Sequence, residues 1–157
     1  MQLLTDEILR SFAMSNVTQV SCGFEHCIAL TASGSIVSWG YGASGSLGHG
    51  NYVSYTQPKL ITAGGLNTKR ITFASTGGYH NGCITDEGEL FTWGRADVGQ
   101  LGLPESYLTS DDMGKVCTFP KALPSISNVK AIALGEAHTL ILDSAHVVHS
   151  CGWNDFG

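Results

Sequence analysis

The sequence predicts an all-β fold of antiparallel sheets stacked around an axis, a partial β-propeller, and two observations lead to that prediction. The first is a repeat: a Gly-x-x-His turn occurs three times, each time at the same distance before a strand that ends in Trp-Gly or Cys-Gly. The second is that the apolar runs 27–30 and 139–142 do not alternate with polar residues, so both of their faces are expected to be buried. Stacked propeller sheets bury both faces in this way.

Composition excludes several other classes of protein. The chain has 157 residues, a formal net charge of -5, 20 Gly and 13% charged residues, which fits neither a disordered polyelectrolyte nor a basic nucleic-acid binder. It contains no apolar run of the roughly 18 residues that span a membrane. The first ten residues carry an acidic pair where a signal peptide has a basic flank. We therefore expect an intracellular protein, cytoplasmic or nuclear, whose five cysteines are free thiols.

The first unit, residues 1–16, has two interpretations. Leu4, Ile8 and Phe12 recur every four residues, as they would on a short amphipathic helix. However, residues 15–17 and 127–129 both read Ser-Asn-Val at the same place in the repeat. This agreement favours the second interpretation, in which residues 1–16 are the tail of a preceding repeat or a capping strand.

The rest of the chain divides into two full repeats, 17–70 and 71–128, and a truncated third repeat, 129–157. Each repeat has three expected strands, and the hairpin between the second and third strands carries a glycine, Gly34 or Gly88, that is expected to adopt a positive φ. In the third repeat His146 stands where that glycine should be. A long segment with a Pro-led end follows the third strand. The expected strands are 17–22, 27–31, 35–39, 71–76, 82–85, 89–93, 129–134, 139–143 and 147–151.

The recurring residues are interpreted as structural. Each His is expected to fix its turn by hydrogen bonding, and the Trp residues are expected to pack between blades. Cys151 replaces the Trp of the third repeat, and Ser46 stands where the second repeat has Gln100. The structural set is Gly23, His26, Trp39, Gly40, Gly77, His80, Trp93, Gly94, Gly135, His138 and Gly152.

The sequence predicts no catalytic residue, cofactor or metal site. The stretch 40–45 matches the dinucleotide pattern G-x-G-x-x-G, but the helix that this motif requires does not follow it. The three repeated histidines could be imagined as metal ligands with nearby cysteines. They belong to different blades, however, and no closely spaced Cys or His pair starts a zinc site. No G-x-S-x-G elbow is present.

These motifs resemble the regulator of chromosome condensation repeat family, whose unit carries G-x-x-H, a hairpin, a strand ending in Trp-Gly and then G-Q-L-G. The resemblance covers nearly the whole chain from Ile8 onward. It implies a ring of seven four-stranded blades, of which this chain supplies about two and a half to three. The rest of a propeller, or another chain, would then close the ring.

The resemblance also suggests partner sites. Family members that exchange guanine nucleotides on small GTPases insert an acidic loop near the bound phosphates, and Asp111 and Asp112 lie in the long acidic segment 103–118. A light-sensing member uses Trp and Arg between the Gly and the His, where this chain offers Phe24, Glu25, Tyr79 and Glu136 as contact residues.

The expected function is therefore a non-enzymatic protein-interaction module with a small GTPase as the candidate partner, acting as an exchange factor or a scaffold. The alternative is a propeller fragment that serves as a ligand receptor or an enzyme inhibitor. Nucleic acid is not the expected partner, because a net charge of -5 opposes binding to phosphates.

Overall fold

The computed structural model describes residues 16–111 and 114–155 and consists of three antiparallel sheets. The first sheet has the order β1-β2-β3-β4, the second β5-β6-β7-β9-β8, and the third β10-β11-β12. Two 3-10 helices, η1 (Ala63–Thr68) and η2 (Glu105–Tyr107), lie in connections. The strands are β1 (Val17–Cys22), β2 (His26–Thr31), β3 (Ile36–Gly40), β4 (Tyr55–Leu60), β5 (Ile71–Thr76), β6 (His80–Thr85), β7 (Leu90–Arg95), β8 (Thr109–Asp111), β9 (Gly114–Ala122), β10 (Val129–Leu134), β11 (His138–Asp143) and β12 (Val148–Gly152).

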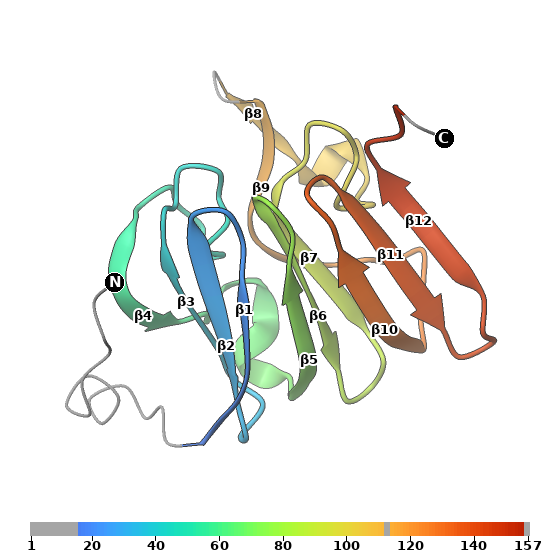
Figure 1. Cartoon of the computed structure of the whole chain (residues 1–157), viewed down its shortest axis with the longest axis horizontal. Coiled ribbons are helices and arrows are strands. Elements are labelled where there is room, and N and C mark those ends of the chain that lie inside the picture. The colour runs from blue at the N-terminus through green and yellow to red at the C-terminus, as the bar shows by residue number, and fades with distance from the viewer. Residues whose placement is uncertain (1–15, 112–113, 156–157) are drawn as a thin grey trace.

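The three sheets lie side by side like the blades of a fan (Figure 1), which confirms the predicted partial propeller. The predicted tail 1–16 falls outside the described residues except for Asn16, and Asp112 also falls outside them. Within the described ranges, no helix has the length and apolar character needed to cross a membrane.

The second sheet has five strands where four were expected. Segment 103–118, where an acidic loop was expected, forms η2, β8 and the first half of β9. Strands β8 and β9 pair as a hairpin from Thr109↔Val116 to Asp111↔Gly114. β-branched residues such as Thr109 and Val116 favour this extended pairing. The acidic residues of the segment made it resemble a loop, so its strands were not predicted.

Apolar side chains fill the two spaces between the sheets. Strand β6 of the middle sheet is buried along its whole length, as expected for a sheet that is covered on both sides. The first core contains Ile28, Leu30, Ile36, Ile61, Leu66, Ile71, Ala74, Cys83, Phe91 and Trp93. The second contains Ile84, Leu90, Leu123, Val129, Ile132 and Ile141.

Polar side chains also join the first two sheets. The amide of Gln19 spans the gap from β1, with its Nε2 donating to the Ala74 carbonyl at 2.6 Å and its Oε1 accepting from the Ala74 N–H at 3.2 Å. The Ser21 and Thr76 hydroxyls lie 2.8 Å apart. Side chains of β1 thus provide hydrogen-bond partners for backbone N–H and C=O groups of β5, the edge strand of the second sheet.

The hairpin glycines adopt the predicted positive φ, at 84° for Gly34 and 76° for Gly88. In the third sheet His146 takes the same conformation, with φ 64°. A non-glycine residue in this region needs support from its surroundings. Asp143 provides support, because its Oδ1 accepts the N–H groups of Ala145 and Val147 at 2.9 and 3.0 Å.

Candidate functional site

The Gly-x-x-His motif has a steric explanation. A Cβ built on Gly23 would lie 2.3 Å from Cε1 of His26, and one built on Gly77 would lie 2.2 Å from Cε1 of His80. Gly135 and His138 repeat the contact at 2.2 Å. Each imidazole therefore occupies the space that a side chain on the glycine would need, and only glycine permits the turn to close on the ring.

The histidine rings point into the neighbouring blade. Nε2 of His26 lies 2.8 Å from Oδ1 of Asn81, and Nε2 of His80 lies 2.9 Å from Oγ1 of Thr139. Asn81 Oδ1 can only accept, so His26 Nε2 carries the proton. Thr139 donates its own hydrogen to the Gln100 carbonyl at 2.8 Å, so His80 is assigned the same tautomer.

A backbone carbonyl completes each contact between blades. The Ser46 carbonyl accepts from Asn81 Nδ2 at 2.8 Å and from Trp93 Nε1 at 3.0 Å. The Gln100 carbonyl accepts from Thr139, and the Cys151 thiol points at it from 3.6 Å. Because the main chain makes these contacts, the side chain at this position can be Ser in one repeat and Gln in the next.

Two of the three repeated histidines, His26 and His80, are held in the inter-blade contacts, whereas His138 is exposed. Burial lowers the pKa of His26, and it lowers the pKa of His80 to about 4. Their Nδ1 atoms are buried and have no hydrogen-bond partner. In the described part of the chain, no three His, Cys, Asp or Glu side chains lie close enough to hold a metal ion.

The residues between the Gly and the His do come together. We call the three turns 23–25, 77–79 and 135–137 the rim, and they lie at one end of the sheets (Figure 1). Backbone bonds link the rim: Phe24 N–H donates to the Gly78 carbonyl, and Gly78 N–H donates to the Glu136 carbonyl, both at 3.0 Å. The turns are therefore spaced by main-chain contacts and present their side chains outward.

Aromatic and acidic side chains cover the rim. The rings of Phe24 and Tyr79 meet edge to face at 5.4 Å, and the Tyr79 hydroxyl donates to Glu25 Oε2 at 3.1 Å. This hydrogen bond raises the pKa of Tyr79. Phe24 remains 58% exposed. Four of the six predicted contact residues, Phe24, Glu25, Tyr79 and Glu136, therefore lie on one surface.

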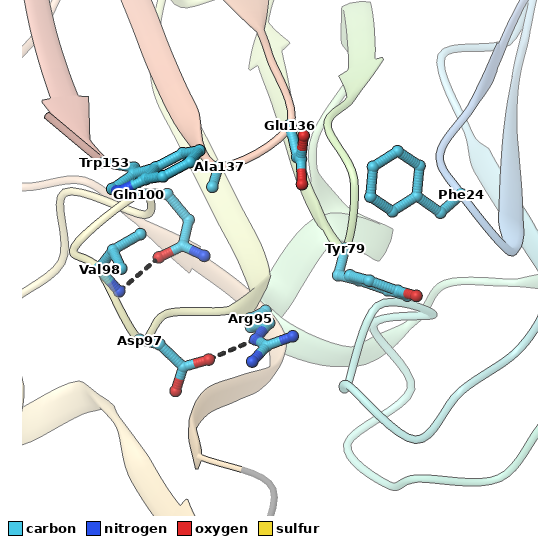
Figure 2. A pocket seen from close by; sticks show the side chains of 9 residues that line it. All are labelled: Phe24, Tyr79, Arg95, Asp97, Val98, Gln100, Glu136, Ala137 and Trp153. Atoms are coloured by element: carbon cyan, nitrogen blue, oxygen red, sulfur yellow. Dashed lines mark hydrogen bonds and ion pairs between the residues drawn. The ribbon is translucent and has the colours of Figure 1, made fainter. Parts of the chain in front are cut away.

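A shallow cavity of about 200 Å³ opens in the rim (Figure 2). Phe24, Tyr79 and Glu136 line it together with residues that were not predicted as contact residues from the sequence. Those residues follow the Trp-Gly or Cys-Gly at the end of a third strand, in segments whose composition differs between repeats. Variable residues beside a repeated Trp-Gly or Cys-Gly were the sequence feature that could have identified these residues as contact residues. They include Arg95, Asp97, Val98, Gln100 and Trp153.

The acidic hairpin β8–β9 is attached to this cavity. Asp97 pairs with Arg95 through Nε, and its Oδ1 accepts the Lys115 N–H at 2.7 Å. The Ala96 N–H also donates to the Lys115 carbonyl at 2.8 Å. The hairpin projects from the end of the sheets that carries the rim (Figure 1), and the backbone of Asp111 pairs with Gly114 near its tip. The fifth predicted contact residue therefore belongs to the same end of the molecule.

Sequence comparison places the chain among known proteins. The regulator of chromosome condensation (RCC1) repeat matches residues 33–84 and 87–142, and a second description of that repeat matches 17–46 and 129–157. The E3 ubiquitin-protein ligase HERC2 of Mus musculus is 34% identical over 142 residues, covering 88% of this chain and 3% of the ligase. The RCC1 domain-containing protein RUG3, mitochondrial, of Arabidopsis thaliana is 37% identical over 131 residues, covering 82% of this chain and 28% of RUG3.

Solved structures agree with the fold. Human WBSCR16 superposes with a TM-score of 0.74 at 28% identity, covering 87% of this chain and 33% of that one. Prp20p of Saccharomyces cerevisiae superposes with a TM-score of 0.77 at 25% identity, again covering 87% and 33%. The chain thus spans a third or less of each of these four relatives.

Proposed function

Because this chain belongs to the regulator of chromosome condensation (RCC1) repeat family, we propose that its rim and acidic hairpin bind a small GTPase. Propellers of the family are generally non-enzymatic interaction modules. The observation that carries the proposal is the continuous surface formed by the aromatic rim, the cavity and hairpin β8–β9. Exposed aromatic residues beside a cavity are typical of the residues that dominate the energy of protein interfaces.

The relatives supply the candidate partner. Prp20p, whose sheets superpose on these, binds the small GTPase Gsp1p and histones. The carboxylates of the rim and hairpin favour a partner with a basic patch. Carboxylates brought close to a bound nucleotide would repel its phosphates and compete with them for Mg²⁺. The proposed consequence of binding is faster release of the nucleotide.

Nucleotide release from a panel of small GTPases tests this proposal. We expect the chain to accelerate release from at least one of them, and Asp111→Ala combined with Asp112→Ala to abolish the acceleration while leaving binding measurable. Phe24→Ala should weaken binding about tenfold, which corresponds to losing about 1.4 kcal/mol. The control is Val148→Ala, an exposed apolar residue at the start of β12, which pairs with Leu142 at the end of β11 away from the rim.

The outcomes separate three functions. Binding with no acceleration of release would support a scaffold and contradict the exchange activity. Equal binding by the Phe24 and Val148 variants would contradict the rim as the binding surface. A receptor for a small ligand is less well supported, because the cavity of about 200 Å³ is smaller than the roughly 300–1,000 Å³ of drug-sized ligand sites.

The outer face of the third sheet supports a second contact, with a further sheet of the same repeat. Leu140 of β11 is 42% exposed, whereas Ile28, at the same place in the first repeat, is 1% exposed. His138 is also exposed, although its counterparts His26 and His80 bond to the next sheet. We expect Leu140→Glu to abolish any self-association of the chain, and to leave its folding intact. Self-association that survives this substitution would contradict the contact.

A further inference from the structure

Two thiols face each other across the strand pair at the start of the rim. Cys22 ends β1, Cys27 lies in β2, and the two residues are direct partners in the ladder. Their Sγ atoms are 3.3 Å apart. Cys22 is exposed and Cys27 is partly exposed. All five cysteines were expected to be free thiols, and the sequence did not distinguish this pair from the other three.

The backbone geometry at this pair suits a cross-link. Gly23 N–H donates to the His26 carbonyl at 2.9 Å, so residues 23 and 26 form a hydrogen-bonded pair. The next pair outward along the ladder, Cys22 and Cys27, is therefore a non-hydrogen-bonded pair, in which side chains approach most closely. The Cα separation typical of such pairs, about 4.5 Å, falls at the short end of the range that disulfides span.

The pair also lies on an accessible face. Side chains alternate along a strand, and Ser21 and His26 point toward the second sheet, where they contact Thr76 and Asn81. Cys22 and Cys27 consequently point to the other side of the first sheet. Cys83 and Cys117 are buried, in contrast, and the Cys151 thiol points at a carbonyl.

We propose that Cys22 and Cys27 form a reversible disulfide on exposure to a low-molecular-weight disulfide such as oxidised glutathione. The Cys22 thiolate attacks one sulfur of glutathione disulfide, forming a mixed disulfide and expelling a glutathione thiolate. Cys27 then loses its proton and attacks Cys22 Sγ, which expels the second glutathione thiolate. Two protein thiols are oxidised to one disulfide and one glutathione disulfide is reduced to two thiols, which carry the two protons.

The environment assigns the order of attack. Burial and the hydrogen bond to Cys22 raise the pKa of Cys27, so its thiolate is scarce. Cys22 is the more exposed of the two and meets the oxidant first. The resulting bond would join the two strands directly below the turn that carries Phe24 and Glu25. Oxidation would therefore restrict the first turn of the rim.

Thiol counting and mass spectrometry of the whole chain in glutathione buffers test the proposal. We expect the thiols that react with maleimide after denaturation to fall by two, from five to three, in oxidised buffer. The peptide that contains both cysteines should become lighter by two hydrogen atoms, and dithiothreitol should reverse both changes. A wild-type chain that keeps all five thiols, or that keeps a glutathione adduct on Cys22, would overturn the proposal.

Single substitutions give matched controls. Cys27→Ser should retain glutathione on Cys22, because no second thiol is present to expel it, and Cys22→Ser should greatly slow the reaction at Cys27. Cys151→Ser, at another partly buried cysteine, should lose two thiols as the wild type does. Disulfide-linked dimers in place of the internal bond would contradict the pairing.

Discussion

The two contacts between neighbouring blades use one plan with different side chains. Between the first and second sheets, His26 bonds to Asn81, and the Ser46 carbonyl receives both Asn81 and Trp93. Between the second and third sheets, His80 bonds to Thr139, and the Gln100 carbonyl receives Thr139 with a thiol in place of the indole. The plan therefore requires a histidine donor, a polar bridge and a carbonyl acceptor.

The two contacts are alike in their hydrogen bonds and differ in how much buried volume they fill. Asn81 and Thr139 can replace each other because both accept one hydrogen bond and donate another. Trp93 and Cys151 do not fill equal volumes: Trp93 is 0% exposed and belongs to the first core cluster, while Cys151 is only partly buried. The first contact should therefore be the stronger of the two.

The largest effect should come from truncating the indole. Trp93→Ala removes a fully buried ring and its hydrogen bond, and we expect a loss of about 3–5 kcal/mol in the free energy of unfolding. Cys151→Ala at the matching position should cost about 1 kcal/mol or less, because little buried volume and a weak donor are lost. Urea denaturation of both variants measures the difference. Equal losses would contradict the inequality of the two contacts.

The second-largest effect should come from acidification, which should weaken the contact of His80 between the second and third sheets. Burial holds the pKa of His80 at about 4 in the folded chain, below its usual 6.5, so the unfolded chain binds the proton first as pH falls. The stability linked to His80 is complete above pH 6.5 and declines as pH falls toward about 4, by about 3 kcal/mol.

Denaturation curves at several pH values measure this decline. His80→Gln keeps an N–H donor and removes the titration, so its stability should depend less on pH than that of the wild type across this range. The control is His146→Asn, which removes an exposed histidine from the third hairpin and keeps a residue that tolerates positive φ. Parallel pH profiles for wild type and His80→Gln would contradict the assignment.

Substitutions of the polar bridge residue Asn81 should have smaller effects on the free energy of unfolding. Asn81→Ala leaves the buried His26 Nε2–H without an acceptor, and we expect a loss of about 2 kcal/mol. Asn81→Thr copies the bridge of the second contact and should cost less, about 1 kcal/mol. Thermal or urea unfolding compares the two variants. A threonine variant as unstable as the alanine variant would show that the two bridges are not equivalent.

Several features of the site followed from the sequence and others did not. The rim residues Phe24, Glu25, Tyr79 and Glu136 were found because they stand between a fixed Gly and a fixed His. Arg95, Asp97 and Trp153 were missed because they occupy the variable positions after the fixed Trp-Gly or Cys-Gly, and contact between segments far apart in the chain brings them to the cavity. Hairpin β8–β9 was missed because its acidic composition resembles a loop.

The repeated residues alone were enough to predict the stacked sheets and the spacing of their turns. This was possible because each repeat has to satisfy the same local demands: a glycine under an imidazole, a tight hairpin and a buried strand. The identity of the side chains that meet between sheets emerged only from the folded arrangement. The contacts of His26 with Asn81, of Trp93 with the Ser46 carbonyl and of Phe24 with Tyr79 all join different sheets. No regularity within one repeat specifies them, because they depend on how adjacent sheets are positioned by packing.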